Sequence, residues 1–300
     1  MKFLIKSFIF LFISFVVLLI GLYTYAYLSP KLDLKTSGSL YLYDNKNDLV
    51  YQGSRSNEWA NLEDISDNLK NAVIAVEDKN FYNHHGFDYL RIAKAMLTNI
   101  KKKSIVQGAS TISQQYIKNL YLDFDKTWKR KAEEAMLTLE LEVHYDKDDI
   151  LEGYLNTINY GHGMYGIENA SQFYFGKKAK DLDLAEAAIL TGIPKSPSNY
   201  SPLVNYKKAK ARQELILKNL LKEKKITTDE YNEAVKEKLT FVGEKEKEEL
   251  STVMYYQDAV MNELKSLKEI PSTFLETGGL KIYTSLNLKG QKELEANVKE

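Results

Sequence analysis

Hydrophobic and polar positions divide the chain into one long apolar segment, two short alternating segments and a series of helical segments. No charged residue occurs from Ser7 to Pro30, and the stretch from Phe8 to Ile20 is apolar except for Ser14. About 20 apolar residues are enough to cross a bilayer as a helix. We therefore predict one transmembrane helix that ends near residue 30.

The charges before this segment predict its orientation. Lys2 and Lys6 precede the apolar run, and positively charged flanks stay on the cytoplasmic side. A cleaved signal peptide is the alternative. The run is long for one, and Thr24-Tyr25-Ala26 offers only a weak cleavage site. We therefore expect an uncleaved, single-pass anchor with a cytoplasmic amino terminus and the remaining chain outside the cytoplasm.

The rest of the chain is mostly helical by its periodicity. Residues 39–52 alternate around an Asn-Lys-Asn turn and predict a β hairpin. Apolar residues then recur at helical spacing, Asp88 and Asp146 are suited to cap helices, and residues 278–300 indicate a strand followed by a helix. The predicted helices include 111–121, 128–144, 148–157, 167–174, 183–191 and 206–222.

These patterns predict a mainly α protein with a small β hairpin and a short α/β tail. Beyond residue 222 the composition shifts to lysine and glutamate. We place the boundaries as follows: a cytoplasmic tip and anchor at 1–30, a strand-containing connector at 31–60, a helical domain at 61–222 and a tail at 223–300.

Charge and composition limit the classes of ligand and of catalytic chemistry that the chain can have. The 41 basic and 41 acidic residues balance, so no global field attracts nucleic acid, and we expect no nucleic-acid partner. Residues 101–131, however, hold eight lysines and arginines against two aspartates. Such a cluster attracts phosphate, pyrophosphate or anionic headgroups, or it is a solvated surface. The absence of cysteine excludes disulfides and thiol catalysis, and four histidines without metal-binding spacing argue against a transition-metal site.

A carboxylate lies on an apolar helical stripe in the segment AVIAVEDKNFYNHHGFD. Leu69, Val73, Glu77 and Phe81 follow one another at intervals of four. Glu77 should therefore be partly withdrawn from water, which makes a carboxylate a better proton acceptor. The alternative is that the helix ends at Val76 and leaves Glu77 exposed.

The segment GASTISQQYIKNL carries a polar stripe. It consists of Ser110, Thr111, Gln114, Gln115 and Lys118. Hydroxyls, carboxamides and one ammonium suit a sugar-phosphate ligand, although a solvated surface would have the same composition.

Two further segments hold charged residues at helical spacing. Glu134 stands four residues after Arg130 and three after Lys131, as in a salt bridge. It either pairs charges at the surface or holds two cations towards a pyrophosphate, and the spacing allows both. In KDDILEGYLN, Glu152 and Asn156 flank an apolar face, and we interpret them as structural support.

Together these segments resemble the peptidoglycan glycosyltransferases of glycosyltransferase family 51, over residues 40–220. The first matching motif is Glu77, Asp78, Phe81, His84 and Gly86. The second is Gly108, Ser110, Thr111, Ile112, Gln114, Gln115, Lys118 and Asn119. The third is Arg130, Lys131 and Glu134, the fourth runs from Ile150 to Asn156, and a looser fifth begins at Leu184. Motifs of this length do not match by chance.

The resemblance implies a lysozyme-like fold on the outer face of a bacterial membrane, with membrane lipids around its anchor. It implies polymerisation of lipid II into β-1,4 glycan strands by inverting displacement of undecaprenyl pyrophosphate. Lipid II and the growing strand would be its ligands, and other cell-wall synthesis proteins its partners. No cofactor is expected to be required, although a magnesium or manganese ion bound through Glu134 is compatible with the resemblance.

The resemblance also assigns roles to residues. Glu77 would be the general base, and Glu134 would order the neighbouring cations. The residues expected to bind substrate are Asp78, Phe81, His84, Ser110, Thr111, Gln114, Gln115, Lys118, Lys126, Arg130 and Lys131.

The tail resembles the approach to the transpeptidase domain of class A penicillin-binding proteins. The S-x-x-K motif of that domain is absent, so we expect no transpeptidase activity in this chain. Two other functions are open: a membrane-anchored, non-catalytic scaffold for cell-wall enzymes, and a muramidase that uses Glu77 as an acid.

Overall fold

The protein is described here by a computed structural model. The described residues are 2–34, 41–52, 58–104, 108–121, 127–162, 164–243, 252–267 and 280–298.

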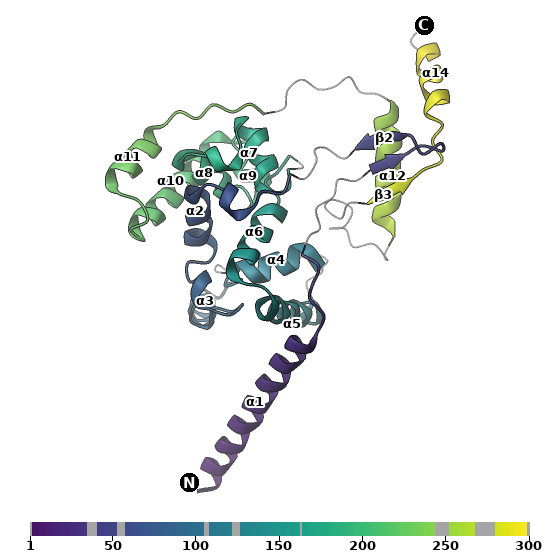
Figure 1. The fold of residues 1–300 in the computed structure, drawn as a ribbon. Coiled ribbons are helices and arrows are strands. Elements are labelled where there is room, and N and C mark those ends of the chain that lie inside the picture. The colour runs from purple at the N-terminus through teal and green to yellow at the C-terminus, as the bar shows by residue number, and fades with distance from the viewer. Residues whose placement is uncertain are drawn as a thin grey trace.

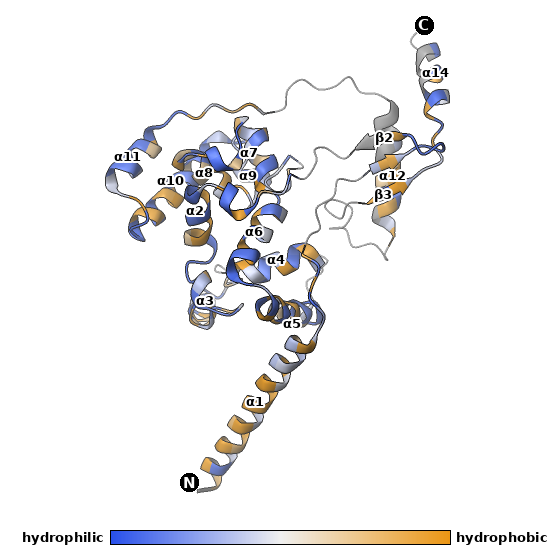
Figure 2. Ribbon diagram, in the orientation of Figure 1, coloured by the Kyte–Doolittle hydropathy of each residue, from blue (hydrophilic) through white to orange (hydrophobic). Residues whose placement is uncertain are grey.

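The amino-terminal segment forms one long helix, α1 (Lys2–Leu28), which is orange along most of its length in Figure 2. Its 27 residues extend about 40 Å, which exceeds the roughly 30 Å of a bilayer core. The stretch Ile5–Leu28 has a mean hydropathy of 2.6 and could cross a membrane by length and composition. The prediction of one such helix is confirmed.

The chain after α1 is fastened to the helical body. α1 packs on α5 (Trp128–His144), and His144 Nε2 lies 3.0 Å from the carbonyl oxygen of Ala26, in the last turn of α1. Three tyrosine hydroxyls then donate to successive carbonyls of the following segment: Tyr145 to Leu32, Tyr121 to Asp33 and Tyr116 to Leu34. The carbonyls of the segment that follows α1 thereby find donors, and this segment is attached to both α4 and the end of α5.

A three-stranded sheet lies apart from the helical body (Figure 1). Its strands β1 (Tyr41–Tyr43) and β2 (Leu49–Gln52) form the predicted antiparallel hairpin. Strand β3 (Lys281–Tyr283), predicted in the tail, pairs in parallel with β1. The connector and the tail therefore share one sheet, an association that the sequence does not indicate. Helices α12 (Thr252–Ser266) and α14 (Leu288–Val298) accompany it.

The helical body contains the predicted helices within one or two residues of their expected bounds. Its elements are η1 (Leu62–Asp64), α2 (Asp67–Glu77), η2 (Phe81–Asn83), α3 (Tyr89–Lys102), α4 (Ile112–Tyr121), α5, α6 (Lys147–Thr157), α7 (Ile167–Phe175), η3 (Ala179–Asp181), α8 (Leu184–Gly192), α9 (Pro197–Tyr200), α10 (Tyr206–Lys222) and α11 (Thr228–Lys236).

The packed body continues past residue 222, where the sequence places a boundary. Ala234 of α11 is buried against α10, and the amide of Val242 donates to the carbonyl of Tyr174 at 2.9 Å. Helix α11 begins with a capping box formed by Thr227 and Glu230. Residues up to Gly243 therefore belong structurally to the helical body.

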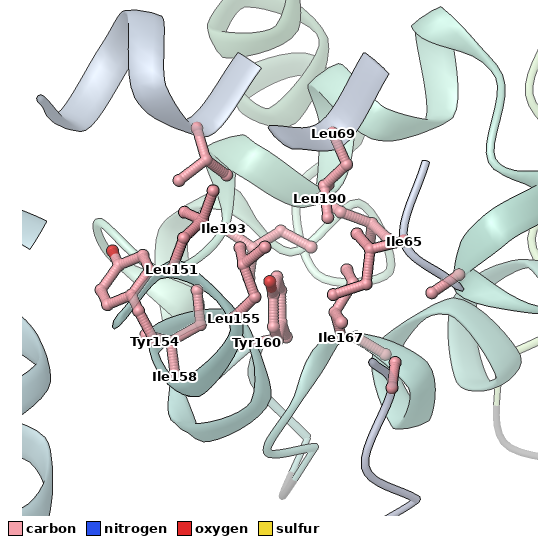
Figure 3. Close-up of a cluster of buried hydrophobic side chains, with 14 of the residues drawn as sticks. Ile65, Leu69, Leu151, Tyr154, Leu155, Ile158, Tyr160, Ile167, Leu190 and Ile193 are labelled. Carbon is pink, nitrogen blue, oxygen red and sulfur yellow. The ribbon is translucent and has the colours of Figure 1, made fainter. Parts of the chain in front are cut away.

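Helix α6 runs through the main core (Figure 3). Its apolar face, made of Ile150, Leu151, Tyr154 and Leu155, is buried as predicted. Helix α4 approaches α6 closely at Gly153, where an added Cβ would lie 2.0 Å from Tyr116 Oη. A side chain at 153 would push α4 away, so this glycine sets the position of the helix on which the candidate site is built.

Candidate active site

The site is organised around the amino terminus of α4, which a buried carboxylate holds against the end of α2. Asp78 Oδ2 accepts a hydrogen bond of 3.0 Å from the amide of Ile112, the first residue of α4. His84 Nε2 lies 3.0 Å from both oxygens of Asp78. A negative charge at a helix amino terminus is favourable. Asp78 and His84, predicted to bind substrate, instead bond to each other and to the backbone, so they position α4.

Phe81 is the clearest correction. Its side chain is fully buried in the main core, and the Lys147 ammonium lies 4.5 Å from the centre of its ring. The predicted contact with substrate is not available to a side chain without exposed surface. The apolar stripe of Leu69 and Val73 leads to Phe81 as predicted, and its function there is packing.

A capping box explains two more residues of the predicted polar stripe. Thr111 Oγ1 accepts from the amide of Gln114 at 3.2 Å, and Gln114 Oε1 accepts from the amide of Thr111 at 3.2 Å. Thr111 Oγ1 also donates to the carbonyl of Gly86 at 2.6 Å. Helix α4 therefore begins at Ile112, and Ser110 and Thr111 lie before it. Thr111 and Gln114 are buried while Ser110 is exposed, so the predicted single stripe is divided.

Glu77 is the last residue of α2 and is half-buried. Its Oε2 accepts a hydrogen bond of 3.1 Å from Gln115 Nε2. Gln115 Oε1 in turn accepts from the hydroxyl of Tyr154 at 3.3 Å. Burial, followed by the nearby Glu77 charge, raises the pKa of Tyr154 well above its usual value, so the phenol remains a donor. Glu77 is therefore held by a neutral relay and keeps part of its surface open.

Glu134 has a different environment on α5. It is only 3% exposed, and its Oε2 accepts from Arg130 Nη1 at 3.2 Å. Its Oε1 accepts from the Lys131 ammonium and, at 3.3 Å, from Gln114 Nε2. The salt bridges predicted from spacing are present, and the near-complete burial of Glu134 excludes an ordinary surface pair.

Helix α4 lies between the two carboxylates. Gln114 and Gln115 are adjacent, and each donates to one of the carboxylates, to Glu134 and Glu77 respectively. Lys118, one turn farther along α4, is half-buried and has no ion-pair partner within the described part of the chain. Lys126 lies outside the described residues.

The donor set around Glu134 does not fit a divalent cation. Both carboxylate oxygens are already bonded to cationic or amide donors, which would repel or exclude a metal. Within the described segments, no three histidine, cysteine, aspartate or glutamate side chains are grouped to hold a metal ion.

Sequence reasoning missed two features beside the site. Arg91 of α3 donates to the backbone carbonyl of Glu77 and lies 3.9 Å from Asp78. Another buried carboxylate, that of Glu142, accepts from Ser113 and from Lys147 at 2.7 Å. Neither pairing has a signal at helical spacing, because the partners belong to different helices.

Two residues predicted to give support tie the connector to α6. Glu152 accepts from the indole of Trp59 at 2.7 Å and from the amide of Leu62 at 2.8 Å. Asn156 bonds both backbone groups of Ala60, at 2.9 and 2.8 Å. These bonds go to residues 59–62 and not to Glu77 or Glu134.

Comparison with known proteins finds one matching family model and similar proteins that are all penicillin-binding proteins. Residues 46–221 match the family model described as Transglycosylase. The chain is 45% identical over 272 residues to penicillin-binding protein 2D of Bacillus subtilis, covering 91% of this chain and 39% of that protein. It is 42% identical over 263 residues to penicillin-binding protein 1A of Neisseria lactamica, covering 88% and 32%.

A solved structure, penicillin-binding protein 1A from Haemophilus influenzae, aligns at 23% identity with a TM-score of 0.46 over 87% of this chain and 28% of that one. The chain thus spans less than half the length of each of these relatives.

Proposed function

Because the chain belongs to the transglycosylase family, we propose that it is a peptidoglycan glycosyltransferase that polymerises lipid II into β-1,4 glycan strands. The observation that carries the proposal is the position of α4 between Glu77 and the cluster of Arg130, Lys131 and Glu134. Displacement of a pyrophosphate requires a proton acceptor for the attacking hydroxyl and cations for the leaving group. Helix α4 is bonded to a carboxylate on each side, and so connects these two parts of the site.

Glu77 acts as the general base. Its carboxylate takes the proton from the 4-hydroxyl of the acceptor sugar as that oxygen forms a bond to the anomeric carbon of the donor. The bond from this carbon to undecaprenyl pyrophosphate breaks, and the leaving group departs with the electron pair. The single displacement inverts the α-linked donor to a β-linked product. Gln115 orients the carboxylate, and its neutral amide leaves Glu77 able to accept a proton.

The cations of α4 and α5 stabilise the departing pyrophosphate. Arg130, Lys131 and Lys118 supply three positive charges, and Glu134 removes one, which leaves two to face the diphosphate. Glu134 keeps the arginine and lysine side chains ordered before substrate arrives. Prearranged charge of this kind lowers the barrier because little reorganisation remains for the reaction itself. This mechanism uses no metal ion.

The membrane anchor fits the lipid-linked substrate. We place α1 in the bacterial cell membrane with the amino terminus in the cytoplasm and the helical body outside. The donor and acceptor both carry polyprenyl chains that stay in the bilayer, so an anchored enzyme meets them at the membrane surface. Other cell-wall synthesis proteins are the partners we propose.

A polymerisation assay tests the proposal directly. The full chain in detergent is incubated with labelled lipid II, and strand length is read on a gel; we expect a ladder of glycan products. A parallel incubation with purified cell wall measures released reducing ends. Release without polymerisation would indicate a muramidase, and lipid II binding without either product would indicate a scaffold. Hydrolysis of a finished glycan has no phosphate to stabilise, so the cationic cluster favours polymerisation.

A further inference from the structure

Four consecutive residues at the start of α4 each donate a hydrogen bond to a different carboxylate. The donor at position 112 is a backbone amide, and the donors at positions 113–115 are side chains. The pairs are Ile112 with Asp78, Ser113 with Glu142, Gln114 with Glu134, and Gln115 with Glu77. Asp78 positions α4, Glu134 orders the cations and Glu77 is the proposed base. Glu142 has no role in that scheme, although it is bonded to α4 as directly as the other three.

Glu142 is buried where α4, α5 and α6 meet. Its side chain is 3% exposed, and its Oε1 accepts from the Ser113 hydroxyl and, at 2.7 Å, from the Lys147 ammonium. Ser113 is fully buried on α4, and Lys147 is the first residue of α6. The ammonium compensates a buried negative charge that would be costly to leave unpaired. The bond from Ser113 goes to a carboxylate, and such bonds are stronger than those between neutral groups.

Ser113 and Gln114 attach α4 to α5 at two separate points. Their partners, Glu142 and Glu134, are eight residues apart on α5, which is about 12 Å along the helix axis. A helix held by one bond can turn about that bond, whereas two bonds to points this far apart fix how α4 lies across α5. Successive side chains on a helix are about 100° apart, so the direction of Gln115 is then fixed as well.

Helix α6 supports the same turn of α4 at two places. Lys147, at its start, bonds to Glu142 and so acts on Ser113. Tyr154, about two turns later, donates to Gln115 Oε1 at 3.3 Å. The residues on both sides of Gln114 are therefore connected to α6, one through an ion pair and the other through a phenol.

We propose that Glu142, held by Lys147, is a positioning residue that fixes the first turn of α4 so that Gln115 reaches Glu77. The inference rests on the proposed function, because Glu77 is the base of that reaction. A buried ion pair adds little stability over apolar side chains of the same size, which favours a role in geometry for this pair. If the turn is loosened, Gln115 no longer holds the Glu77 carboxylate in the orientation that the acceptor hydroxyl requires. The effect should therefore be on kcat, because the cations that hold the pyrophosphate are unchanged.

Removal of one hydroxyl tests the proposal. Ser113→Ala in the full chain leaves the ion pair of Glu142 with Lys147 in place, and we expect kcat for polymerisation of lipid II to fall about fivefold, with KM within about twofold of the parent. Ser201→Ala is the matched control, because Ser201 is 1% exposed and its hydroxyl lies 2.9 Å from His162 Nε2, in a bond that does not involve α4. The control should keep the parent's kcat. Equal kcat values for the two variants would overturn the proposal.

A double substitution shows whether Ser113 acts through Gln115. In a Gln115→Met protein the bond to Glu77 is already lost, so the addition of Ser113→Ala should lower kcat by less than about twofold more. The same fivefold fall in both backgrounds would indicate a general structural loss and would overturn the action through Gln115.

Glu142→Leu combined with Lys147→Met tests the carboxylate itself. This exchange replaces a buried ion pair by apolar side chains of similar size, which folded proteins commonly tolerate. It leaves the Ser113 hydroxyl without its acceptor, and we expect kcat to fall by the factor found for Ser113→Ala, again with little change in KM. An unchanged kcat would show that Glu142 does not position α4.

Hydrogen exchange separates this inference from the proposed reaction, because it requires no turnover. Amide exchange of residues 112–116 is measured by mass spectrometry on the detergent-solubilised full chain. We expect Ser113→Ala to exchange about tenfold faster than the parent in this segment, and Ser201→Ala to exchange at the parent's rate. Faster exchange in a protein whose parent makes no glycan would overturn the proposed reaction alone. Unchanged exchange would overturn the positioning by Glu142, whatever the activity of the parent.

Discussion

The two carboxylates on either side of α4 differ in what they are bonded to. Glu134 is buried and bonded by an arginine, a lysine and an amide. Glu77 is half-buried and ends a helix, and within the described segments its carboxylate accepts a side-chain hydrogen bond from one neutral amide. A buried carboxylate bonded to cationic and amide donors can hold those donors in place, whereas a half-buried carboxylate beside a neutral amide has surface that a substrate hydroxyl can reach. The difference supports the roles proposed above, with Glu77 as the base and Glu134 as the residue that orders the cations.

Replacing Glu77 by glutamine should have the largest effect on activity. The amide has nearly the same shape but cannot accept the acceptor's proton, so we expect polymerisation of lipid II to fall about 10³-fold. The free energy of unfolding should change little, because Glu77 has no ion-pair partner among the residues that the structure describes. Gel analysis of labelled strands and denaturant unfolding of the full chain measure the two quantities.

Glu133→Gln is the matched control. Glu133 neighbours the cationic cluster but is exposed and lies 3.9 Å from Lys129 in a surface pair. Such pairs contribute little, so activity should stay within about twofold of the parent. A Glu77→Gln protein as active as this control would remove Glu77 as the base.

Glu134→Gln should reduce activity less than Glu77→Gln does, and should reduce the free energy of unfolding more. The change leaves Arg130 and Lys131 without their carboxylate, but these cations are 19% and 44% exposed and can regain water. We therefore expect a loss of about 1–2 kcal/mol in the free energy of unfolding, below that for a fully buried pair. Activity should fall about 10²-fold as the cations lose their order. An unchanged free energy of unfolding would show that the bonds of Glu134 to Arg130 and Lys131 do not stabilise the fold.

Local spacing was sufficient to predict one side of this comparison and not the other. Arg130, Lys131 and Glu134 are neighbours on one helix, so three- and four-residue intervals predict their contact. Glu77 and Gln115 are 38 positions apart, and only the tertiary fold, which places the end of α2 beside α4, brings them together. Family resemblance named both residues without predicting the bond.

Helical periodicity gave a wrong interpretation where the same spacing is compatible with two structures. Thr111 and Gln114 fit a ligand-facing stripe, yet their spacing is also that of a capping box, and burial selects the second. Periodicity likewise predicts α3 but cannot state which face meets water. The pairing of β1 with β3 joins segments 240 residues apart, beyond the reach of any local pattern.

Gln115 and Gln114 give a finer test of the difference between Glu77 and Glu134, because each glutamine donates to one of these carboxylates. Gln115→Met keeps the volume but removes the bond to Glu77 and the acceptor of the buried Tyr154 hydroxyl, so we expect about a tenfold fall in kcat and a loss of about 1 kcal/mol of stability. Gln114→Met removes the side-chain half of the cap and the bond to Glu134, and should cost about 1 kcal/mol of stability. Steady-state kinetics and denaturant unfolding on both proteins measure this contrast. A fall in kcat as large for Gln114→Met as for Gln115→Met would contradict the separate roles of the two glutamines.

The smallest effect is expected from Tyr154→Phe, which removes only the hydroxyl that supports Gln115. The phenyl ring keeps the core filled, so kcat should fall about two- to fivefold through a looser Gln115. Burial raises the pKa of Tyr154 well above its usual value, so the phenol stays protonated at every assay pH up to about 10. The parent and variant should therefore have pH–rate profiles of the same shape, displaced by a constant factor from pH 6 to 10. A profile that converges with the parent's above pH 8 would mean that the hydroxyl ionises in that range, and the relay from Tyr154 through Gln115 to Glu77 would then not be neutral.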